Sequence, residues 1–132
     1  SGNSKITVLT DTGYVPERVR PELESSDLIV IEANHEVNML KAGPYPYRLK
    51  LRILGDSGHL SNETAGEILS DVMSRDDRYR TILLAHLSRE NNFPQLALQT
   101  VTNILEEHRF YPGKHMRLEV LKREGISGFT EI

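Results

Sequence analysis

Two short, nearly continuous apolar runs constrain the fold of this chain more than any other feature. They are DLIVIEA at residues 27–33 and RYRTILLA at residues 78–85. Runs of this length and composition are typical of strands that are covered on both faces, as in a parallel sheet. A further run, KITVLT at 5–10, predicts another buried strand, and MRLEVL at 116–121 predicts a weaker strand near an edge.

Helical patterns separate these strands. Ser61 or Asn62 can cap a helix that runs to about Met73, because short polar side chains bond to free backbone N–H groups there. Asn92 can cap a longer helix with Pro94 in its first turn.

Three shorter segments complete the order of elements. Residues 15–24 and 34–41 predict short helices, and residues 48–54 are compatible with either a strand or a helix. Strand and helix therefore alternate along the chain, which predicts the α/β class.

Composition narrows the kind of protein. The chain has 132 residues, the size of one domain, so we treat residues 1–132 as a single domain. Its net charge of −3 argues against binding of nucleic acid over the whole surface of the chain by electrostatic attraction. A local phosphate-binding site is still compatible with this charge. There is no cysteine, so a transition metal would need His, Asp or Glu ligands.

Hydropathy predicts the cellular setting. No apolar run approaches the roughly 20 residues of a membrane span, and the amino end has no apolar region of the signal-peptide kind. We therefore expect no membrane association and a cytoplasmic location. The first strand begins after only four residues, which is found in natural domains and also in a chain cut from a longer one.

Polar residues follow the predicted strands at their carboxyl ends. Asp11 follows the first strand, Glu32 and His35 close the second, and His86 follows the third. Sites in open α/β sheets form beyond these strand ends, so the side chains should converge. A carboxylate and imidazoles in this arrangement can hold one or two hydrolytic metal ions.

His59 lies in a different context, just before the helix that starts near residue 62. A helix N-terminus offers free N–H groups to a substrate phosphate, and a histidine beside it can act on a phosphoryl oxygen. Glu32 could orient that imidazole. The helix near Asn92 offers a second N-terminus after His86. The polar residues expected to bind substrate at these two helix starts are Ser61, Asn62, Ser88 and Asn91.

Structural interpretations compete with each of these roles. Asp11 can simply form the DTG turn, and Glu32 can lie at the surface. His59 and His86 can be core or capping histidines, and for His35 we favour a solvated pair with Glu36. His108 and His115 are expected to be structural. The basic side chains Arg18, Arg20, Lys50 and Arg52 are expected to be solvated, although RLKLR at 48–52 could contact a polyanion.

Four motifs in fixed order carry a family resemblance. They are LTDTGY at 9–14, IEANHE at 31–36, GDSGHLSNETAG at 55–66 and LAHLSRENN at 84–92. Together they resemble the carboxyl-terminal half of metallo-β-lactamase-fold nucleases. The similarity is greatest to the WalJ/YycJ group of bacterial exonucleases, and tRNase Z is a more distant relative. It covers roughly residues 5–105.

The resemblance implies roles for individual residues. It places Asp11 as the carboxylate that bridges two metal ions and His86 as a ligand of one of them. It places His59 at the scissile phosphate or as a proton donor, with Glu32 orienting it. The ExNH signature of the group includes Asn34 and His35, to which the resemblance gives no role.

One departure from the family is decisive. The H-x-H-x-D-H motif that supplies most metal ligands is absent. The family fold is a four-layer αββα sandwich of two similar halves, so the resemblance implies that this chain is one half. Its expected partner is the missing amino-terminal half.

Our leading hypothesis is a metal-dependent phosphodiester hydrolase like a DNA exonuclease, with two zinc or manganese ions and with DNA favoured over RNA. This chain would supply half of the site. Two alternatives stay open. One is an RNA-processing or small-molecule hydrolase on the same fold. The other is a non-catalytic half-domain that forms homo-oligomers through an exposed sheet face.

Overall fold

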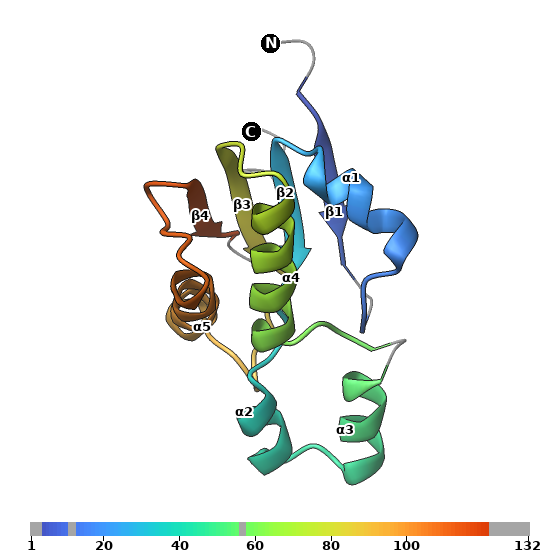
Figure 1. Cartoon of the computed structure of the whole chain (residues 1–132). Helices are drawn as coiled ribbons and strands as arrows, with labels where there is room; N and C mark the ends of the chain where they lie inside the picture. Colours follow the sequence, from blue (N-terminus) through green and yellow to red (C-terminus); the bar gives the residue numbers. More distant parts are fainter. Residues whose placement is uncertain (1–3, 11–12, 56–57, 122–132) are drawn as a thin grey trace.

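The computed structural model describes residues 4–10, 13–55 and 58–121. These residues form a sheet of four strands with helices between them (Figure 1). In chain order the elements are β1 (Ile6–Leu9), the 3-10 helix η1 (Glu17–Val19), α1 (Arg20–Glu24), β2 (Leu28–Glu32), α2 (Val37–Ala42), α3 (Tyr47–Leu54), α4 (Asn62–Arg75), β3 (Arg80–Ala85), α5 (Pro94–Glu107) and β4 (Met116–Val120). The α/β class predicted from the sequence is confirmed.

The four strands are all parallel and follow each other in the order β1-β2-β3-β4. Val30 of β2 lies beside Leu83 of β3, and Glu32 lies beside Ala85. Because each crossover runs through helices, all carboxyl ends of the strands meet at one edge of the sheet. The residues that follow β2 and β3 are therefore neighbours in space.

Helices α4 and α5 pack against each other and, with α1, cover one face of the sheet (Figure 1). The main core lies between these helices and the sheet, and it includes Ile31 and Leu84, both fully buried. Gly66 allows the close approach of the two long helices. A Cβ atom built on it would lie 2.9 Å from Cδ1 of Ile104.

The second face of the sheet carries a smaller apolar cluster centred on Val30 and Leu83. By strand alternation Ile6 and Val8 lie on this same face, since they pair with Leu28 and Val30. They are 58% and 53% exposed. The prediction of a fully buried first strand is therefore wrong, because β1 is an edge strand with its second face open.

Two further predictions need correction. The N-cap of α5 is Phe93 and not Asn92, whose buried side chain accepts a hydrogen bond from the Phe93 N–H instead. Residues 15–24 form a 3-10 turn followed by the five-residue α1, because Pro21 stands at the start of that helix. Ser61, by contrast, caps α4 as expected by accepting the N–H of Thr64 at 3.0 Å.

Residues 48–54, whose pattern is compatible with either a strand or a helix, belong to helix α3. Together with α2 this helix stands apart from the sheet, at the end where β2 finishes (Figure 1). No residue of α3 is buried. In the part of the chain that the structure describes, no helix combines the length and the hydropathy that crossing a membrane requires.

Candidate active site

Glu32 is the centre of the candidate site. It is the last residue of β2, and its side chain is fully buried. One carboxylate oxygen, Oε2, accepts Nδ1–H of His59 at 2.8 Å and the backbone N–H of Leu60 at 3.0 Å. The other oxygen, Oε1, accepts Nδ1–H of His86 at 2.6 Å. A buried carboxylate is stable here because both of its oxygens accept hydrogen bonds.

The two histidines reach Glu32 from different elements. His59 lies between α3 and α4, and its backbone N–H donates to the backbone carbonyl of Ile53 at 3.0 Å. His86 follows β3, and its side chain is 50% exposed whereas that of His59 is 30% exposed. The ring centroids are 5.4 Å apart. The structure thus brings together three of the residues predicted from strand ends and from the helix start.

His86 has a strained backbone. Its φ of 61° lies in the left-handed region, which costs a non-glycine residue roughly 1 kcal/mol or more. This conformation turns the chain sharply at the end of β3. It directs the imidazole back toward Glu32.

Asn34 holds this turn in place. Its Nδ2 donates to the His86 carbonyl at 2.9 Å, and its own carbonyl accepts the N–H of Ser88 at 2.8 Å. The sequence alone predicts no role for Asn34, because the left-handed turn that this side chain holds has no signature in the sequence. We interpret Asn34 as the residue that positions His86.

His35 is buried, so its interpretation as a solvated partner of Glu36 is wrong. The residue is 1% exposed because the chain after β2 runs inward and forms a bridge to Ser61 at the start of α4. Its Nδ1 bonds to Oδ1 of Asn34 at 3.2 Å, and its buried Nε2 has no hydrogen-bond partner among the described residues. Burial and the nearby His59 lower the pKa of His35 to about 4, against a smaller opposing effect of Glu36.

A layer of buried amides lies behind the histidines. The side chains of Asn62 and Asn92 bond to each other at 2.9 Å. Oε1 of Glu36 accepts from both Asn62 and Thr100 at 2.8 Å. This network ties the start of α4 to α5 and to the loop after β2, and so fixes the backbone on which His59 stands.

The predicted substrate contacts at the two helix starts stay predictions. The hydroxyl of Ser61 caps α4. The backbone N–H of the fully buried Asn62 donates to the His35 carbonyl, and its side-chain amide bonds within the network above. Asn91 is 1% exposed, whereas Ser88 is partly exposed and accepts the Asn91 N–H. Of the predicted site residues, Asp11 lies outside the described residues.

The chemistry of the donors suits a divalent metal. Ligand atoms of Glu32, His59 and His86 lie within 4.8 Å of one another. Distances of 2.6 and 2.8 Å from oxygen to Nδ1 are those of hydrogen bonds, which fix the tautomer and leave the ring lone pair on Nε2. Histidines that bind metals commonly donate their other N–H to a carboxylate in this way.

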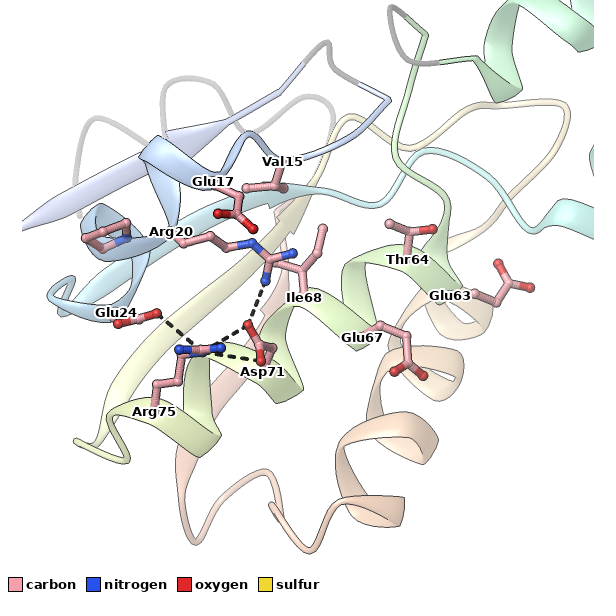
Figure 2. A pocket seen from close by; sticks show the side chains of 11 residues that line it. Val15, Glu17, Arg20, Glu24, Glu63, Thr64, Glu67, Ile68, Asp71 and Arg75 are labelled. Carbon is pink, nitrogen blue, oxygen red and sulfur yellow. Dashed lines mark hydrogen bonds and ion pairs between the residues drawn. The ribbon is translucent and has the colours of Figure 1, made fainter.

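A surface groove between α1 and α4 lies apart from this cluster (Figure 2). Arg20 and Arg75 bond there to Asp71, at 2.8 and 3.4 Å. Acidic side chains outnumber these two arginines, because the lining also includes Glu17, Glu24, Glu63 and Glu67. A groove of this charge repels phosphate, so it does not extend the candidate site.

Comparison with known proteins finds relatives named YycJ and WalJ. The chain is 42% identical over 114 residues to exodeoxyribonuclease YycJ of Bacillus anthracis, a match that spans 86% of this chain and 42% of the relative. It is 39% identical over 130 residues to exodeoxyribonuclease WalJ of Streptococcus pneumoniae, spanning 98% of this chain and 48% of the relative. The chain is a homologue of the YycJ and WalJ proteins. The resemblance stated from the sequence motifs is thereby confirmed.

The homology has a clear extent. The chain spans about half the length of the curated relatives it matches. No protein-family model matches it. No solved structure matches it either.

Proposed function

We propose that the protein carrying this chain is a cytoplasmic, metal-dependent exodeoxyribonuclease, and that this chain supplies half of its two-metal site. The observation that carries the proposal is the single buried carboxylate of Glu32 that accepts Nδ1–H from both His59 and His86. The names of the YycJ and WalJ homologues support DNA as the substrate.

The roles of the residues follow from this geometry. Glu32 fixes both imidazoles in the tautomer with the lone pair on Nε2. Nε2 of the more exposed His86 would ligate a metal ion. For Asp11, a place in the same metal site is what the family resemblance implies. Bound zinc or manganese would supply the Lewis acidity that stabilises charge on the phosphate.

His59 would act on the substrate side of the site. In its protonated form the ring would donate from Nε2 to a phosphoryl oxygen or to the leaving oxygen, while Glu32 stabilises the imidazolium through Nδ1. The backbone N–H of His59 donates to the backbone carbonyl of Ile53, and this bond fixes the position from which the ring projects. Ser88, in the partly exposed loop between β3 and α5, would contact the same phosphate.

The missing half of the fold is part of the proposal. We propose that an amino-terminal half completes a metallo-β-lactamase αββα sandwich by covering the second sheet face. The apolar cluster around Val30 and Leu83, and the exposed Ile6 and Val8, support a protein cover there. A second copy of the chain on this face is the alternative, and it would make the chain a non-catalytic association module.

The test is the exonuclease activity of His86→Ala in the protein at its full natural length, with zinc or manganese present. Loss of a metal ligand should reduce the rate by at least about 100-fold. The matched control is His108→Ala, because among the described residues the His108 ring bonds only to the carbonyl of Ile104, at the far end of α5. A wild-type rate in His86→Ala would overturn the ligand assignment.

Substrate class needs a separate measurement. DNA, RNA and a small phosphodiester should compete under one metal condition, and DNA should be hydrolysed fastest. Faster hydrolysis of RNA or of the small diester would favour the alternative hydrolases on the same fold.

A further inference from the structure

Charge is unevenly distributed along this chain. Residues 37–55 contain no acidic side chain but four basic ones, Lys41, Arg48, Lys50 and Arg52. Since the whole chain carries a net charge of −3, the remainder is more acidic than the whole. The cations are gathered on α2 and α3, the two helices that stand apart from the sheet (Figure 1).

The side chains of α3 are open to a partner. Tyr47 is 74% exposed, and Arg48 and Arg52 are exposed with no ion pair among the described residues. These two arginines lie one turn apart, about 6 Å along the helix axis, so they project from the same side.

The position of α3 connects this basic surface to the candidate site. The carbonyl of Ile53, in the last turn of α3, accepts the N–H of His59 at 3.0 Å. A polyanion lying along α3 would therefore reach the histidines without crossing the acidic groove between α1 and α4.

We propose that α3 binds the sugar-phosphate backbone of single-stranded DNA whose end enters the site of Glu32, His59 and His86; this rests on the proposed function. Arg48 and Arg52 contact successive phosphates, and Tyr47 stacks on a base. Stacking on an exposed tyrosine needs an unpaired base, which is why the occupant is a single strand.

The experiment uses the catalytically complete protein at its full natural length and measures its affinity for a fluorescent oligothymidine as a function of salt. The variant is Arg48→Ala with Arg52→Ala. The control, Arg18→Ala with Lys114→Ala, removes the same charge from exposed sites on other elements. Loss of two phosphate contacts should reduce the slope of log affinity against log salt by about 1.4.

A second pair of variants tests the stacking. Tyr47→Ala should weaken binding several-fold, whereas Tyr47→Phe, which keeps the ring, should bind like the wild type. Tyr79→Ala is the matched control, because Tyr79 is 60% exposed just before β3, far along the strand from the site.

The outcomes separate this inference from the proposed function. Hydrolysis of a small phosphodiester should be unchanged in all α3 variants, because it does not need the DNA-binding surface. Its rate in His86→Ala tests the proposed function separately. An unchanged salt slope in the arginine variant would overturn the role of α3. So would unchanged DNA binding with an altered sedimentation coefficient, because α3 would then be a protein-binding helix that uses its exposed leucines.

Discussion

Burial of His35 makes the stability of this protein depend on pH in one direction. The pKa of His35 is about 4 in the folded chain against 6.5 for an unperturbed histidine. Between these values the unfolded state binds more protons than the folded state. The His35 contribution to stability is therefore constant above about pH 6.5, falls as the pH decreases from there, and levels off below about pH 4.

The size of the effect follows from the shift. A difference of one pKa unit corresponds to 1.36 kcal/mol, so the full window is worth about 3 kcal/mol. Between pH 7.5 and pH 4.5 the His35 contribution to the free energy of unfolding should fall by about 2.5 kcal/mol. That is a large fraction of the stability of an ordinary domain.

Urea unfolding at several pH values between 7.5 and 4.5 would measure this loss, with a chelator present to remove bound metal. The variant His35→Asn keeps a donor toward Oδ1 of Asn34 but does not titrate. Its stability should fall by about 2.5 kcal/mol less than that of the wild type over the same range. The reasoning would be refuted if wild type and His35→Asn lost stability in parallel. His108→Asn, at an exposed site, is the control and should follow the wild type.

Two further changes test the site and the core. Glu32→Gln keeps the side-chain volume, but the glutamine amide cannot accept N–H donors at both of its terminal atoms. Zinc affinity measured by calorimetry should therefore fall about 10–100-fold. The control is the exposed Glu106→Gln, and equal zinc affinity in the two variants would contradict the role of Glu32. Gly66→Ala places a methyl group 2.9 Å from Cδ1 of Ile104, and the overpacking of about 1–3 kcal/mol should exceed the helix-propensity gain of about 1 kcal/mol. Urea unfolding should show net destabilisation that is partly relieved when Ile104→Ala is added, and a Gly66→Ala protein more stable than the wild type would disprove the close packing.

Local patterns in the sequence were sufficient to predict the central sheet and the meeting of Glu32 with His86. Both depend on the order of the strands and on the rule that parallel strands share their carboxyl edge. His59 was predicted from a different local signal, the Ser61 cap that starts α4. These predictions needed no knowledge of how the loops run.

The features missed depend on contacts between segments far apart in sequence. His35 becomes buried only because the loop after β2 bridges to residue 61, a contact between segments 26 residues apart. The buried side chain of Asn92 bonds to that of Asn62, and Phe93 is the N-cap of α5 instead. The apolar letters of β1 could not reveal that this strand lies at an edge, since exposure depends on what lies beside it.

Under the proposed role of His86 as a metal ligand, its left-handed backbone sets stability against function at one position. A glycine there would relieve the strain, because it adopts a positive φ without a steric penalty. It would also remove the imidazole that faces Glu32. Selection for a more stable chain and selection for an intact site would therefore favour different residues at position 86, and a stabilised but inactive glycine variant is the form in which that conflict would appear.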